Sequence, residues 1–181
     1  FSFKINNTKI NVRTPDGFYE SSNIYPERLD YVRTIYPDYM QVHALLAPKG
    51  IPDNERIARY MLLVSEKDAD NQKITQEFFN DLREKSREQQ FTLMNDYKDL
   101  IEDALEDGTS KLLKKYDVEF VANIGETVPL GVFFDNKKAI SINMITNPNV
   151  VSNGVTYSPL QLASLSMVFI KNRLNNLIYL N

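Results

Sequence analysis

The sequence contains no cysteine, no tryptophan and only one histidine, His43. The absence of cysteine excludes disulfides and thiolate chemistry. The scarcity of histidine removes the side chain that most often acts as a general acid or base near neutral pH. The sequence also has no glycine-rich phosphate loop, no nucleophile elbow and no cluster of metal ligands. We therefore expect no catalytic residue, no cofactor and no metal site.

Length and composition fit one domain. The chain has 181 residues, of which 43% are hydrophobic, so it can build a core without disulfides. We predict a single domain over residues 1–181. The net charge of −3 does not favour binding to nucleic acid. No apolar run of about 18 residues is present, so we expect no transmembrane segment.

The chain begins with Phe1 rather than with methionine. Removal of a signal segment and expression as a fragment would each produce such a start. The first would imply export, and we expect a periplasmic or otherwise exported protein, with a cytoplasmic location as the alternative. An apolar run directly before Asn181 suggests that the native chain continues.

The first 66 residues carry local signals for short elements. Alternating apolar and polar residues predict two short strands within 1–14. The segment 14–18, Thr-Pro-Asp-Gly-Phe, predicts a turn, because proline presets φ and glycine accepts a positive φ. Pro26 suits the first position of a short helix over 26–36. Two further strands are expected over 40–47 and 57–64.

Residues 73–106 form the predicted helical segment. Five apolar residues recur along it and should face a sheet: Ile74, Phe78, Leu82, Leu100 and Ile101. Residues 83–90 include no apolar side chain, so one long helix with a solvated middle and two helices broken near 89–91 both fit. Gly108 is expected to end the segment, and Thr109 to cap a last short helix.

From residue 118 onwards, the sequence pattern predicts strands. They are predicted over 118–123, 130–134, 139–146, 160–170 and 177–180. A hairpin turn over 135–138 connects two of them, and turns this short allow only antiparallel neighbours. Because the helices are grouped in mid-chain, we predict an α+β fold with one antiparallel β-sheet flanked by helices.

The turn at 14–18 and three later stretches resemble a known layout. The later stretches are Asn123-Ile124-Gly125, Pro129-Leu130-Gly131-Val132-Phe133 and Ala139-Ile140-Ser141-Ile142. They resemble the central hairpin of Mog1/PsbP-like uncharacterised exported bacterial proteins, mainly over 118–181. The resemblance implies an antiparallel sheet flanked by helices and a binding or accessory role, and it transfers no site residue.

Two groups of polar residues could carry chemistry. His43 lies in a predicted strand without a motif that supplies a partner, so we expect a structural or exposed histidine rather than a catalytic one. Carboxylates are dense at Asp96, Asp99, Glu102, Asp103, Glu106 and Asp107. Calcium sites use such oxygens, but the loop motif that curls them around the ion is absent, so a solvated acidic helix face is expected.

Half of the tyrosines fall within 21 residues of the sequence: Tyr19, Tyr25, Tyr31, Tyr36 and Tyr39. Tyrosine is enriched at binding surfaces because it combines apolar area with a polar tip. We expect these rings to cover one end of the sheet, and their alternative role is a recognition surface.

These patterns favour a non-enzymatic binding or accessory domain of unknown specific role, with an unknown protein partner. One alternative is a carrier of a small apolar ligand, with a pocket lined by Phe78, Phe79, Leu82 and Leu93. The other is an enzyme of an unrecognised family that uses carboxylates or a tyrosine.

Overall fold

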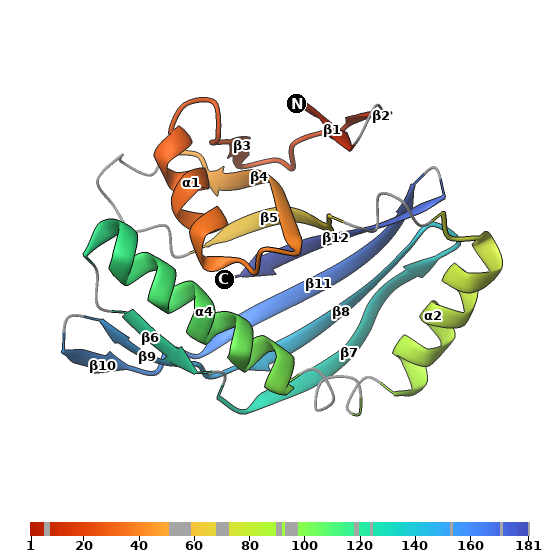
Figure 1. Cartoon of the computed structure of the whole chain (residues 1–181). Helices are drawn as coiled ribbons and strands as arrows, with labels where there is room; N and C mark the ends of the chain where they lie inside the picture. Colours follow the sequence, from red (N-terminus) through yellow and green to blue (C-terminus); the bar gives the residue numbers. More distant parts are fainter. Residues whose placement is uncertain are drawn as a thin grey trace.

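The computed structural model describes residues 1–5, 8–50, 59–67, 73–89, 92, 98–117, 120–123, 125–152, 154–170 and 172–180. This part of the chain forms an α+β fold with a large antiparallel sheet, as the sequence predicted (Figure 1). Two smaller sheets and three described helices complete it.

Seven strands form the main sheet. They are β3 (Phe18–Glu20), β4 (Met40–Pro48), β5 (Tyr60–Glu66), β7 (Thr127–Asn136), β8 (Ala139–Thr146), β11 (Gln161–Ile170) and β12 (Arg173–Leu180). Their order is β3-β4-β5-β12-β11-β8-β7, and every neighbouring pair is antiparallel. The hairpin turn predicted over 135–138 joins β7 to β8.

The prediction of one sheet over 118–180 was wrong in part. β6 (Phe120–Asn123), β9 (Asn149–Ser152) and β10 (Val155–Tyr157) form a separate three-stranded sheet. Gly125 and Pro148 mark the break. A Cβ atom at Gly125 would overlap the carbonyl oxygen of Asn147, and Pro148 has no N–H to continue the ladder. The strand pair therefore leaves the main sheet at this point.

The N-terminal elements match their local signals. β1 (Ser2–Ile5) and β2 (Thr8–Asn11) form a hairpin. The turn at 14–18 closes with a 3.1 Å hydrogen bond from the Phe18 N–H to the Pro15 carbonyl, and Gly17 has a φ of 81°. α1 (Pro26–Ile35) begins with Pro26 in its first turn, as predicted.

The described part of the long segment contains two separate helices, α2 and α4, and not one continuous helix. α2 (Gln76–Glu88) begins where the Thr75 hydroxyl accepts a 3.1 Å hydrogen bond from the Phe78 N–H. The second helix, α4 (Lys98–Tyr116), runs straight through Gly108. Thr109 is therefore inside a helix, where its hydroxyl donates to the Glu106 carbonyl at 2.8 Å, and it does not act as a cap.

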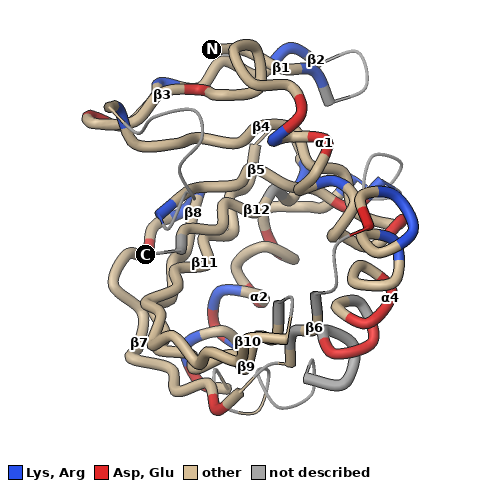
Figure 2. The backbone as a smooth tube through the Cα atoms, turned by 90° about the vertical axis from the view of Figure 1, so that its left-hand side faces the viewer, with Lys and Arg blue, Asp and Glu red and all other residues tan. Residues whose placement is uncertain are grey.

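The three described helices lie on one side of the main sheet, which we call the inner face (Figure 2). α1 packs there through Leu29, against Val42, Leu62 and Val64. α2 packs through Phe79, whose ring is fully buried and stacks on Phe169 at 5.3 Å. Side chains alternate along a strand, so β11 presents Ser164, Ser166 and Val168 on the opposite, outer face.

The predicted sheet-facing stripe of 73–106 was wrong for Phe78, which is 53% exposed beside the buried Phe79. Ile74 lies before the start of α2, and both Ile74 and Leu82 are half-buried. The side chains of Leu100 and Ile101 lie outside the described part. The phase of α2 follows Phe79 and Ser86, both fully buried and two turns apart.

Candidate functional site

The five clustered tyrosines have different surroundings. Tyr19 is half-buried in β3. Tyr25 lies under the Arg28 guanidinium at 4.4 Å, and the Tyr31 ring packs 5.6 Å from the Tyr116 ring of α4. Tyr39 is exposed. Tyr25 and Tyr31 are thus used in packing around α1.

Tyr36 lines a surface pocket of about 360 Å³ between the end of α1 and the start of β4. The charged groups of its lining are Arg33, Asp38 and Lys67. The Arg33 guanidinium donates twice to the Val42 carbonyl, at 3.1 and 3.0 Å. This polar lining suits a small polar molecule better than an apolar one.

The burial of Tyr36 has a consequence at high pH. Desolvation raises the pKa of its phenol above the ordinary value, and Tyr60 raises this pKa further. A raised pKa in the folded state contributes stability below about pH 10, the ordinary pKa of tyrosine, and this stability is lost as the pH rises.

We expect the free energy of unfolding to fall above about pH 10, by at most about 1.4 kcal/mol per pH unit from this residue. Tyr36→Phe should flatten that fall, because it removes the group that ionises in the unfolded chain. Urea titrations across this pH range measure the effect. Tyr39→Phe, at an exposed tyrosine, is the control, and an equal flattening in both variants would contradict the assignment.

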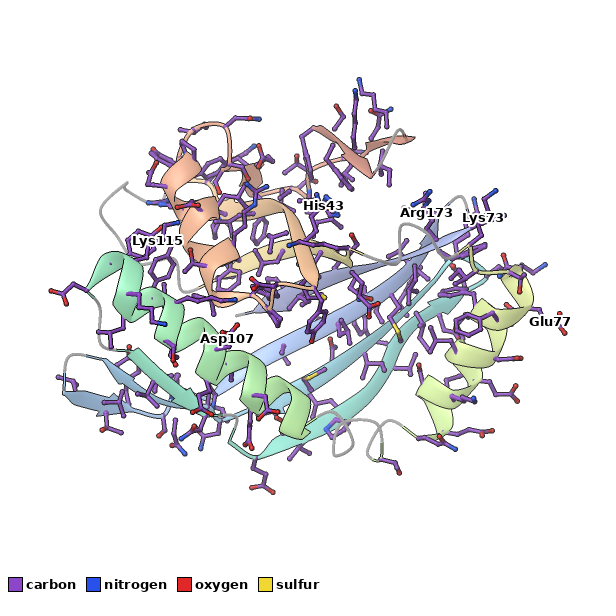
Figure 3. All side chains as sticks on the ribbon, viewed as in Figure 1. His43, Lys73, Glu77, Asp107, Lys115 and Arg173 are labelled. Atoms are coloured by element: carbon purple, nitrogen blue, oxygen red, sulfur yellow. The ribbon has the colours of Figure 1, made fainter. Side chains whose placement is uncertain are left out.

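Ion pairs surround Asp107, the last residue of the acidic run, in the half of α4 that packs near α1. Asp107 pairs with Lys111 at 2.6 Å, and Lys111 also reaches Asp38 at 2.8 Å. Lys115 pairs with Asp30 at 2.6 Å across the two helices (Figure 3). The hydrogen bond from Lys111 holds the pKa of Asp38 below its ordinary value, and the hydrogen bond from Lys115 does the same for the pKa of Asp30.

No group of three potential metal ligands occurs among the described residues. Asp96 and the side chain of Asp99 lie outside them. Ion pairing accounts for Asp107, and Glu102 also has an interaction partner. Within the described part, the acidic run therefore forms no carboxylate cage.

His43 is paired with a hydroxyl group. Its Nε2 lies 2.8 Å from the Ser65 Oγ, and the Phe3 ring of β1 packs 4.9 Å from its imidazole. His43 is the extra residue of a β-bulge in β4, where the register shifts between Val42 and Ala44. A histidine beside a serine is the arrangement that activates a nucleophile. Ser65 is only 3% exposed, however, and neither residue lines the described pocket.

We predict a structural role for this pair. Ser65→Ala should lower the free energy of unfolding by about 1 kcal/mol, because it removes one buried hydrogen bond. A fluorophosphonate probe, which labels activated serines, should leave Ser65 unmodified in mass spectra of the folded protein. Labelling of the wild type that disappears in Ser65→Ala would contradict this prediction and indicate an enzyme.

The sequence did not indicate that one strand of the described part, β7, carries four exposed large apolar side chains. We call this group the β7 surface: Val128, Leu130, Phe133 and Phe134, whose exposed fractions are 42, 55, 57 and 46%. β7 is the last strand of the main sheet, and two register shifts place Leu130 and Phe133 in bulges. Pro129 and Gly131 in this segment are the only sequence signals of an edge strand.

Val128 pairs with Ile145, and Phe134 pairs with Ser141, so both lie on the outer face. The three described helices lie on the inner face, opposite these side chains (Figure 2). Contiguous exposed apolar groups of this kind mark contact sites more often than isolated apolar residues do. The β7 surface is therefore the best candidate for a binding site.

Among the described residues, no helix is both long enough and apolar enough to cross a membrane. The resemblance to Mog1/PsbP-like proteins stays a prediction from the sequence. Comparison of the chain with protein-family models, curated proteins and solved structures finds no match.

Proposed function

We propose that this chain is a non-enzymatic binding domain that holds another protein against the β7 surface. The observation that carries the proposal is the exposure of four large apolar side chains on one edge strand. Aromatic residues are enriched at protein interfaces, and Phe133 and Phe134 supply two rings side by side along the chain. Export remains a prediction from the sequence alone.

The backbone of β7 argues for contact through side chains rather than strand addition. Bulges between Pro129 and Gly131 and between Val132 and Phe134 interrupt the regular edge. Bulges and proline are devices that prevent edge-to-edge pairing. Binding of a partner would therefore be driven mainly by burial of these apolar side chains.

The absence of cysteine gives a direct test. Leu130→Cys carries a single thiol for a photo-crosslinker on the β7 surface, and Ser110→Cys carries one on exposed α4 as the matched control. In extract of the source cells, the first variant should form a defined cross-linked product and the second should not. Excess unlabelled wild type should suppress the product, because it competes for the partner.

Unlabelled Phe133→Ser should compete poorly, since it lacks a central ring of the β7 surface. Equal products from both cysteine positions, or equal competition by wild type and Phe133→Ser, would rule out this surface.

The apolar-carrier alternative has less support. Phe78 from its proposed lining is exposed, Phe79 is packed against Phe169, and Leu93 lies outside the described residues. The enzyme alternative would rest on His43 and Ser65, and the fluorophosphonate experiment tests it.

A further inference from the structure

We propose that the occupant of the β7 surface is a second copy of this chain, bound antiparallel about a twofold axis near Gly131. The inference rests on the proposed function, because it names the partner for the same surface. Closed twofold dimers are the commonest soluble oligomers, and each presents one self-complementary patch twice.

Charge at the two ends of β7 supplies the complementarity. Glu126 precedes the strand, while Lys137 and Lys138 form the turn after it, and all three are exposed. Within the described residues, none of the three makes an ion pair. The ends of β7 thus carry opposite charges, separated by roughly 36 Å of extended chain at about 3.3 Å per residue.

The positive end is reinforced by neighbouring elements. The Gln76 amide of α2 donates to the Lys137 carbonyl at 2.8 Å, and the Ile74 N–H donates to the Asn172 carbonyl at 2.9 Å. These contacts bring the start of α2 and the β11–β12 turn to the β7–β8 turn. Lys73 and Arg173 lie at this same end of the sheet (Figure 3).

Two β7 strands that run antiparallel across the interface, in contact through their side chains and not through backbone pairing, satisfy both features together. The apolar residues extend from Val128 to Phe134, and the charges from Glu126 to Lys138, so both sets are centred near Gly131. A twofold axis there places apolar against apolar and Glu126 of one copy against Lys137 and Lys138 of the other. A parallel pair would instead oppose like charges, which is costly at an interface.

The outer face can be covered without leaving its polar groups unpaired. Ser141 donates to Ser166 at 2.7 Å, and Ser164 donates to Asn143 at 2.5 Å, across β8 and β11. Burial of an unpaired hydroxyl is costly, and these bonds reduce that cost. A stable interface needs about 800 Å² from each copy. Half-buried apolar side chains extend the surface beyond β7: Ile145, Leu162 and Val168.

The test uses exposed charges, so the variants should fold. Sedimentation velocity of the full chain, from micromolar to millimolar, should show a reversible dimer. Lys137→Glu/Lys138→Glu should weaken dimerisation at least about tenfold, and so should Glu126→Lys, because each sets like charges opposite one another twice. The double control Lys49→Glu/Lys114→Glu changes the same net charge away from β7 and should leave dimerisation unchanged.

The decisive sample mixes the two weakened variants. In a heterodimer, Glu126 of one copy meets the unchanged lysines of the other, and the introduced glutamates meet the lysine that the Glu126→Lys substitution supplies. The mixture should therefore dimerise nearly as well as wild type, and about 1 M salt should reduce the differences by screening. Phe133→Ser should abolish the dimer.

A wild type that stays monomeric at millimolar concentration would overturn the inference. Charge variants that dimerise like wild type, or a mixture without recovery, would do the same. If wild type is monomeric but Leu130→Cys still cross-links a different protein in competition with wild type, the proposed function stands and the self-association fails. If sedimentation shows no dimer and Leu130→Cys forms no cross-linked product, both proposals fail.

Discussion

Phe79→Ala should lower the free energy of unfolding by about 3–5 kcal/mol, the usual cost of removing a fully buried phenylalanine ring. The ring is 0% exposed and stacks on Phe169 of β11 with an interplanar angle of 16°. Polar contacts also attach α2 to the sheet: Arg83 and Arg87 pair with Asp135, and the Gln76 amide donates to the Lys137 carbonyl. Loss of the ring leaves a cavity between α2 and the sheet. Urea unfolding followed by circular dichroism measures the change.

Phe78→Ala is the matched control, because it removes the same type of side chain from the adjacent position of the same helix. Phe78 is 53% exposed, so we expect a loss of less than about 1 kcal/mol. Equal losses in the two variants would mean that α2 packs with a different face. Leu82 is half-buried, and Leu82→Ala should fall between the two.

Some parts of the fold are determined by residues that are close together in the sequence. The turn at 14–18, the start of α1 at Pro26 and the hairpin at 135–138 were all confirmed. Each depends on φ preferences or on residues within one turn, so the neighbouring residues in the sequence are enough to predict it. Strand β8 matches its predicted range because the turn at 135–138 precedes it and Pro148, which has no N–H to continue the ladder, follows it.

Features that depend on distant contacts were not predictable in this way. Positions 78 and 79 are both phenylalanine, and packing against Phe169 of the sheet decides which of the two rings is buried. The separate sheet of β6, β9 and β10 arises where Gly125 meets Asn147, which is 22 positions away along the chain. Tertiary packing sets such features, and periodicity alone gives no preference.

The candidate site also depends on contacts between residues that are distant in the sequence. Residues 130–134 read correctly as a strand, but their exposure follows from the place of β7 at the end of the strand order. That order is set by long-range pairing, for example of β5 with β12. The hydrogen bond of His43 with Ser65 likewise joins residues 22 positions apart, and no local sequence motif predicts it.

Gly108→Ala tests the clearest conflict between local preference and packing. Alanine favours a helix over glycine by about 1 kcal/mol, so the intrinsic preference of α4 predicts stabilisation. Gly108 is buried where α4 meets α1, however, and an added Cβ would overlap the carbonyl oxygen of Ile35. A backbone carbonyl at a helix end cannot rotate aside as a side chain can, so the two helices must separate.

We therefore expect Gly108→Ala to destabilise the protein by about 1–3 kcal/mol, the usual cost of overpacking. Separation of α1 and α4 would also weaken the pairing of Lys115 with Asp30. Ser110→Ala is the control, because it also introduces alanine into α4, at an exposed position without a steric conflict, and should be neutral or slightly stabilising. Urea unfolding of both variants decides between the two effects, and a Gly108→Ala protein at least as stable as wild type would show that propensity dominates at this crossing.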